Sequence, residues 1–182
     1  QYLQNVSGFN PFWTGMAFMP QEIVLFIVAN TAGMFVTRYG PRAVLAAGIT
    51  SLAIGALLIS RMTPAGGYMD SIFPGFIFIG IGIGTVGVAG SISATMGVPQ
   101  LQHGLAAGIY NTGNQIATAL SLSVLSAVSG ACTNALLAAA PGMSTVAAIV
   151  SGYSTAFLLS VGFALAGLAV LWVLGRTSSH SS

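Results

Sequence analysis

Continuous apolar runs, long enough to cross a membrane as helices, most restrict what this chain can fold into. Only 3% of the residues are charged, and the only acids are Glu22 and Asp70. An ordinary soluble domain carries roughly 25% charged residues, and these help to cover its surface. A chain with so few charges cannot make a water-soluble surface, so we expect lipid to be the solvent around it.

Five stretches of transmembrane length are separated by turn-forming residues. About 20 apolar residues in an α-helix cross roughly 30 Å of hydrocarbon. The expected spans are 12–36, 42–60, 71–96, 104–128 and 151–174. Residues 1–9 are a candidate remnant of a further helix. A membrane β-barrel would need strict apolar and polar alternation, whereas these runs are continuous. The expected fold class is therefore all-α, a polytopic transmembrane helix bundle.

The arginines predict the orientation of the spans, because cytoplasmic loops carry an excess of positive charge. Arg38 and Arg42 share the first loop. If that loop is cytoplasmic, Arg176 also lies inside and only Arg61 lies outside. We therefore expect loop 37–42 and the C-terminus on the cytoplasmic side of the cell membrane. A net charge of +2 resting on four arginines does not make the clustered basic surface that nucleic acid requires.

The sequence contains no recognisable catalytic or metal-binding set. Cys132 has no second cysteine, and no histidine lies near it. The serines lack a GxSxG context and a nearby histidine and acid. The GxGxxG string at Gly82–Gly87 follows no strand and precedes no suitably spaced acid, so we reject dinucleotide binding. We expect no enzyme activity, no cofactor and no metal.

Glu22 lies near the middle of the first expected span. A charged side chain at that depth costs on the order of 3 kcal/mol on insertion scales, which makes the residue a functional candidate. Hydrocarbon favours the neutral form of a carboxyl group, so Glu22 is a candidate for proton coupling. The alternative is a neutral carboxyl group that hydrogen-bonds a neighbouring helix or lines a cavity without coupling.

Amide side chains cluster in the fourth expected span. Asn111 and Gln115 are four residues apart and share a helix face, with Asn114 beside them. Two hypotheses stay open: these groups line a cavity that binds substrate, or they hydrogen-bond another helix at about 0.6 to 2 kcal/mol per bond. Asn30 and Thr31 of the first span are further candidates for the same cavity.

Glycines recur at a spacing of four residues in two of the expected spans. Gly80 and Gly84 form one pair, and Gly104 and Gly108 form the other. Small residues at this spacing let helix backbones approach closely in a membrane. We expect these four glycines to be helix-packing residues.

The segment Gly33-Met34-Phe35-Val36-Thr37-Arg38-Tyr39-Gly40-Pro41-Arg42 resembles a signature of the major facilitator superfamily. That signature reads Gly, four residues, Arg, any residue, Gly and then a basic residue. The segments 1–4, 15–20 and 104–112, together with Gln115, are similar to the last third of the fourteen-helix drug/proton antiporter branch of this family.

The resemblance implies roles for residues of this loop. Gly33, Arg38, Gly40 and Arg42 would be gating and stability residues of a cytoplasmic loop, without contact to substrate. The family usually has an aspartate where this chain has Thr37, so the resemblance does not support a charge relay here.

The resemblance also implies a partial protein. Residues 1–176 would be part of a C-terminal transmembrane domain, and 177–182 a disordered cytoplasmic tail. Its partners would be the lipid bilayer, the missing N-terminal half, a small hydrophobic substrate and protons. The implied function is secondary active, proton-coupled export of drug-like compounds. The alternative is a non-transporting membrane subunit or an inactive truncated product.

Overall fold

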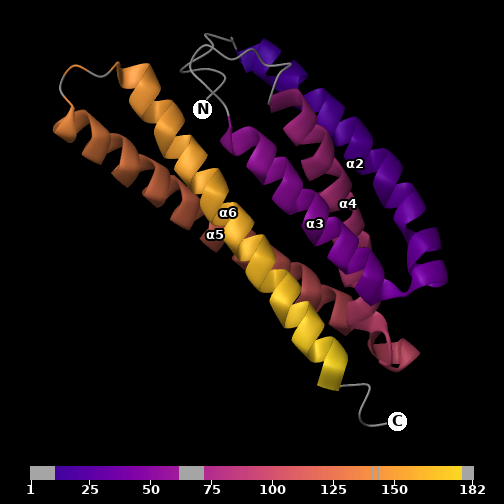
Figure 1. Cartoon of the computed structure of the whole chain (residues 1–182). Helices are drawn as coiled ribbons and strands as arrows, with labels where there is room; N and C mark the ends of the chain where they lie inside the picture. Colours follow the sequence, from indigo (N-terminus) through magenta and orange to yellow (C-terminus); the bar gives the residue numbers. More distant parts are fainter. Residues whose placement is uncertain (1–10, 62–71, 141, 143, 178–182) are drawn as a thin grey trace.

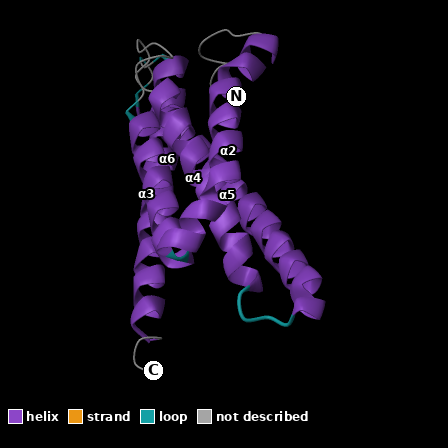
Figure 2. Ribbon diagram, turned by 90° about the vertical axis from the view of Figure 1, so that its right-hand side faces the viewer, coloured by secondary structure: helices purple, strands orange, loops and turns teal. Residues whose placement is uncertain are grey.

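The computed structural model describes residues 11–61, 72–140, 142 and 144–177. Within these ranges every regular element is a helix and none is a strand, which confirms the expected all-α class (Figure 2). The helices are α2 (Pro11–Tyr39), α3 (Pro41–Ser60), α4 (Phe73–Thr95), the short 3-10 helix η2 (Gln100–Gln102), α5 (His103–Ala139) and α6 (Thr145–Thr177). The candidate remnant at 1–9 and tail residues 178–182 lie outside the described residues.

Each of the five α-helices contains a stretch that is long and apolar enough to cross a membrane. Large apolar residues remain on the outside of the bundle. Phe26, Leu122 and Val170, for example, are 58 to 68% exposed. Water would penalise such a surface, whereas lipid does not. The chain is therefore a multi-pass membrane protein.

Two helices extend well beyond the expected spans. We expected the fourth span to end near Val128 and the fifth to begin near Ser151, but α5 continues to Ala139 and α6 begins at Thr145. The added helical parts, 129–139 and 145–150, contain hydroxyl groups that find hydrogen-bond partners in the helices. Thr133, for example, donates to the carbonyl oxygen of Ser129 at 2.8 Å. At about 1.5 Å per residue α5 is about 55 Å long, so it tilts or projects beyond the hydrocarbon.

Helix α4 lies between α2 and α3 and packs against both (Figure 1). Helix α3 also packs against α6, and α6 packs against α5. In Figure 1 α5 crosses α6, and these two long helices meet the other three mainly through α3 and α4. The turn between α2 and α3, the connection between α4 and α5, and the last turn of α6 lie at one end, which we call the arginine end because it holds Arg38 and Arg42.

Glycines bring the backbones of α3 and α4 together. A Cβ atom at Gly55 would lie 2.9 Å from the carbonyl oxygen of Gly75, and one at Gly82 would lie 2.9 Å from the carbonyl oxygen of Gly48. Real Cβ atoms do not tolerate such distances to backbone. Close approach through small residues is how membrane helices gain packing energy where no hydrophobic effect drives association.

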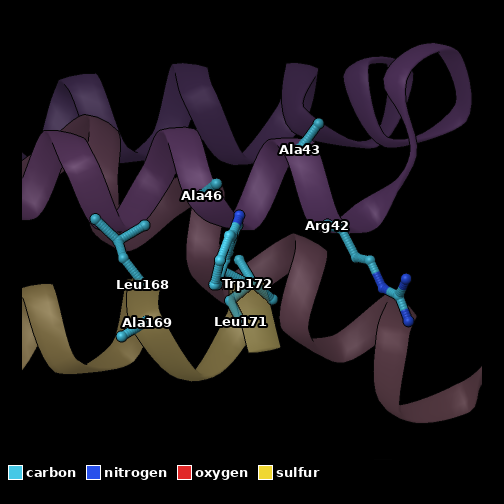
Figure 3. Close-up of a pocket in the computed structure, with 7 residues that line it drawn as sticks. All are labelled: Arg42, Ala43, Ala46, Leu168, Ala169, Leu171 and Trp172. Carbon is cyan, nitrogen blue, oxygen red and sulfur yellow. The ribbon is translucent and has the colours of Figure 1, made fainter. Parts of the chain in front are cut away.

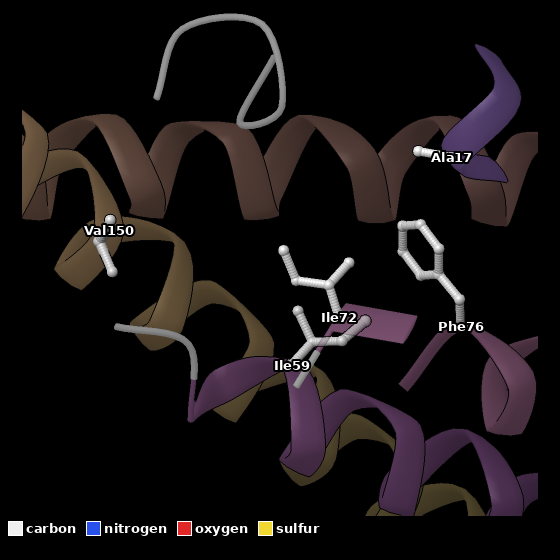
Figure 4. Close-up of a cluster of buried hydrophobic side chains, with 5 residues drawn as sticks. All are labelled: Ala17, Ile59, Ile72, Phe76 and Val150. Carbon is white, nitrogen blue, oxygen red and sulfur yellow. The ribbon is translucent and has the colours of Figure 1, made fainter. Parts of the chain in front are cut away.

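Small apolar clusters complete the interior at the two ends of the bundle. At the end opposite the arginines, Ala17, Ile59, Phe76 and Val150 come together from α2, α3, α4 and α6, with Ile72 beside the start of α4 (Figure 4). At the arginine end, the buried residues Val36, Val44 and Ala89 join α2, α3 and α4.

Hydroxyl groups connect helices that are distant in sequence. Ser51 of α3 donates to the carbonyl oxygen of Phe78 in α4 at 2.7 Å. Ser154 of α6 donates to the carbonyl oxygen of Ser60 at the end of α3. These bonds satisfy polar groups inside the bundle, which hydrocarbon would otherwise leave without partners.

Candidate functional site

The turn between α2 and α3 consists of a single residue, Gly40. Its φ of 82° and ψ of 155° lie in a region that is almost closed to residues with a Cβ atom. The Gly40 amide donates to the carbonyl oxygen of Val36 at 2.9 Å and so closes the end of α2. Pro41 then starts α3, a position where its missing N–H costs nothing. The Gly-Pro pair therefore fixes a sharp reversal at the arginine end.

Thr37 and Arg38 make only local contacts within the part of the chain that the structure describes. The Thr37 hydroxyl donates to the carbonyl oxygen of Gly33 one turn earlier, at 2.9 Å. The Arg38 guanidinium carbon lies 5.3 Å from the centre of the Tyr39 ring, a cation–π distance. Both side chains are exposed. The surface of this turn is thus available to another part of the protein or to the membrane interface.

A groove of about 450 Å³ lies beside this turn, between α2, α3 and α4. Thr31, Phe35 and Tyr39 line it from α2, and Thr85 lines it from α4. Thr31 faces this groove, but its neighbour Asn30 is exposed and donates to the carbonyl oxygen of Phe26 at 2.7 Å. The two candidates that adjoin in sequence therefore lie on different faces of α2.

Gly80 and Gly84 lie where α4 crosses α2. A Cβ atom at Gly80 would lie 2.6 Å from the carbonyl oxygen of Gln21, and one at Gly84 would lie 3.0 Å from that of Leu25. In contrast, no atom of the described residues outside their own helix segment lies within 4 Å of a Cβ atom built at Gly104 or Gly108. A packing role for this second pair stays a prediction.

Glu22 lies at the level of the α2–α4 crossing, between Gln21 and Leu25 in sequence, and its side chain is exposed. Gln21 donates from its side-chain amide to the Glu22 carboxyl group at 3.5 Å, the limit of a hydrogen bond. Glu22 and Asn30 are eight residues apart, about two helical turns, so they share one face of α2. The polar groups of α2 thus lie on a face that the described helices leave open.

The amide groups of α5 lie in its most exposed part. Asn111, Asn114 and Gln115 are all exposed, and none has a hydrogen-bond partner for its side chain among the described residues. Nearby, Tyr110 packs its ring against Gly90 of α4, which is where α5 contacts that helix. Along 111–124 every residue is exposed, so no described helix covers this polar stretch.

The interface between α3 and α4 was not foreseen from the sequence. We searched for glycines four residues apart, whereas the pairs that meet here, Gly48 and Gly55 in α3 and Gly75 and Gly82 in α4, are seven apart. Two helical turns return a residue to nearly the same face. Equal seven-residue spacings in consecutive helices were the signal that would have identified this contact.

Proteins that export antibiotics or confer resistance to them are similar to nearly all of this chain. It is 31% identical over 178 residues to the puromycin resistance protein of Streptomyces alboniger. The aligned part covers 95% of this chain and 35% of that protein. It is 31% identical over 169 residues to the cephamycin export protein of Amycolatopsis lactamdurans, covering 92% and 32%. A multidrug resistance protein of Mycobacterium tuberculosis is 29% identical over 142 residues, which are 75% of this chain and 25% of that protein.

The chain spans about a third of the length of the first two of these relatives. No protein-family model matches the chain.

Proposed function

Because the chain belongs to the major facilitator superfamily of transporters, we propose that it is the C-terminal portion of a secondary active exporter. In this proposal the exporter moves small hydrophobic compounds out of the cell and takes up protons in exchange. The names of the relatives, which refer to antibiotic export and drug resistance, support this substrate class.

The observation that carries the proposal is the uncovered polar stretch of α5. An amide without a partner is expensive in hydrocarbon, so Asn111, Asn114 and Gln115 need either other polar groups or water. A helix bundle from the remainder of a longer transporter would supply both, because a transport pathway between two bundles is lined with water and polar groups. We place α5 at that pathway, with its amides binding substrate.

The polar face of α2 contributes to the same mechanism. Glu22 is the only acid among the described residues, and it lies on an open face of α2 at the level of the α2–α4 crossing. We assign to it the uptake and release of the coupling proton. Asn30 extends this face toward the arginine end, whereas Thr31 faces the groove beside the turn.

The arginine turn holds α2 and α3 at a fixed reversal while the bundles rock. Gly40 and Pro41 limit the conformations of this turn, and exposed Arg38 and Arg42 mark it as cytoplasmic by the excess of positive charge there. Gly33 has no side chain, and no described atom lies within 4 Å of the place where its Cβ atom would be. In this proposal Gly33, Arg38, Gly40 and Arg42 act in gating and stability, as the family resemblance implies, and do not bind the exported compound.

The test is transport by the complete protein in proteoliposomes that contain a hydrophobic fluorescent dye. We expect an imposed pH gradient to drive dye movement, and the double substitution Asn111→Leu with Gln115→Leu to slow it by roughly tenfold, the effect of losing about 1.4 kcal/mol of binding. Ser160→Ala in α6 is the control, because the Ser160 hydroxyl donates to the carbonyl oxygen of Ala156 in its own helix. Dye movement without gradient dependence would remove the antiporter. No movement at all would favour a non-transporting membrane subunit.

A further inference from the structure

A second groove runs along the outside of the bundle between α3 and α6 (Figure 3). It has a volume of about 630 Å³ and reaches the arginine end. Ala43 and Ala46 form its α3 wall, and Leu168 belongs to its α6 wall. The alanines leave room where larger side chains would fill the space between the two helices. The body of the groove is therefore apolar and open to lipid.

Two amphipathic side chains line this groove, Arg42 at its arginine end and Trp172 farther in, beside Ala46. Arg42 extends from the first turn of α3, and Trp172 rises from α6 toward Ala46 (Figure 3). Trp172 is 62% exposed, so its indole lies at the surface of the bundle. Tryptophan rings favour the headgroup level of a bilayer, which places this end of the groove at the membrane interface.

The charge at this end has one sign. Arg38 and Arg42 are both exposed there. Glu22, the one acid that the structure describes, lies 17 residues before the end of α2, or about 25 Å away along the helix. An apolar groove with an arginine at its mouth complements a molecule that has an anionic head and a hydrocarbon tail.

We propose that this groove binds an anionic phospholipid of the bilayer. One acyl chain lies along Ala43, Ala46 and Leu168, beside the Trp172 ring, and the phosphate group lies at the Arg42 guanidinium. Arginine suits this position because its planar group carries five N–H donors and can bind phosphate through two of them while keeping other contacts. The site is independent of the proposed transport pathway, because α5 contributes no residue to it.

The site can be tested through the fluorescence of Trp172. This chain has two tryptophans, so Trp13→Phe, together with phenylalanine in place of any tryptophan elsewhere in the complete protein, leaves Trp172 as the only one. The protein is placed in nanodiscs of phosphatidylcholine that contain either brominated phosphatidylglycerol or brominated phosphatidylcholine, whose bromine atoms quench a nearby indole. We expect brominated phosphatidylglycerol to reach the same quenching at a mole fraction about fivefold lower than brominated phosphatidylcholine. This is the preference that one arginine gives an anionic lipid at the interface.

Two variants separate the site from general attraction to the surface. Arg42→Gln should abolish the preference, whereas Arg38→Gln should keep it, because Arg38 does not line the groove. Ala46→Leu should lower quenching by both lipids, because its side chain fills the space for the acyl chain. Circular dichroism confirms that each variant is folded. Equal quenching by the two lipids, or equal effects of the two arginine substitutions, would overturn the proposal.

Discussion

Gly55 of α3 and Gly75 of α4 hold the backbones of their helices in reciprocal contact. A methyl group at Gly55 would lie 2.9 Å from the carbonyl oxygen of Gly75, and one at Gly75 would lie 3.1 Å from that of Gly55. Because α4 also packs against α2, and α3 against α6, the two helices that this contact joins also connect α2 and α6 to the bundle. We expect its loss to destabilise every other helix packing.

Gly75→Ala should therefore lower the free energy of unfolding by about 1 to 3 kcal/mol, the usual range for overpacking a close interface. The added methyl group meets the Ile59 side chain and the Gly55 backbone, and the backbone cannot move aside without separating the helices. Unfolding by denaturing detergent in mixed micelles measures the change.

Gly87→Ala in the same helix is the matched control. No described atom lies within 4 Å of a Cβ atom there, so only helix propensity should change. Helix propensity favours alanine over glycine, so the free energy of unfolding should rise by roughly 0.5 to 1 kcal/mol. If both substitutions destabilised the protein equally, the close α3–α4 contact would not be the reason.

The turn at Gly40 provides a second prediction. Gly40→Ala should cost of order 1 to 3 kcal/mol, because the backbone conformation there is strained for any residue with a side chain. Gly33→Ala, with open space around its Cβ atom and an ordinary helical backbone, should be neutral or slightly stabilising. The same unfolding assay compares the two, and a neutral Gly40→Ala would mean that the turn adopts a different conformation.

The hydroxyl of Thr133 provides a third prediction, since it connects α5 to α6. It is 3.3 Å from the carbonyl oxygen of Ala148 as well as 2.8 Å from that of Ser129 in its own helix. Thr133→Val keeps the shape and should cost about 0.6 kcal/mol, and at most about 2 kcal/mol.

Thr118→Val is the corresponding control, because the Thr118 hydroxyl donates only to the backbone carbonyl oxygen of Asn114 in its own helix. A double-mutant cycle with a substitution in α6 isolates the interhelical part. Equal costs at positions 118 and 133 would show that the bond across the α5–α6 interface contributes nothing measurable.

Glu22→Gln tests the proposed proton coupling. Glutamine has nearly the same shape and keeps an acceptor for the Gln21 amide, but it does not ionise. In proteoliposomes of the complete protein we expect the dye to equilibrate while its uphill movement under a pH gradient is lost. A variant that still pumps the dye against its concentration would exclude Glu22 as the coupling residue.

The helices could be predicted from the sequence because composition alone decides whether a segment lies in lipid. Their ends were harder to predict. The fourth expected span ended near Val128, whereas α5 continues past Thr133, whose hydroxyl bonds to the carbonyl oxygen of Ser129 one turn back and to that of Ala148 in α6. Such bonds make polar residues compatible with a long helix, and they depend on which helix lies alongside.

The candidate site could be predicted only residue by residue. Helical spacing placed Asn111 and Gln115 on one face, but nothing in the sequence showed that α5 would be uncovered along this stretch. Likewise, four-residue spacing did not distinguish Gly80, which meets α2, from Gly104, which meets no described neighbour. The face of a helix follows from its own sequence, whereas the partner of that face depends on the whole assembly.

Labelling of single cysteines on α5 tests most directly whether its polar stretch lines a water-filled pathway. In the complete protein, Cys132 and any cysteine outside this chain are first replaced by alanine. Asn111→Cys and Gln115→Cys are then exposed to a water-soluble maleimide, with Phe163→Cys on the lipid-exposed surface of α6 as the control. The account predicts that positions 111 and 115 are labelled, that a transported dye slows the labelling, and that position 163 is not labelled. Positions 111 and 115 as unreactive as position 163 would contradict it.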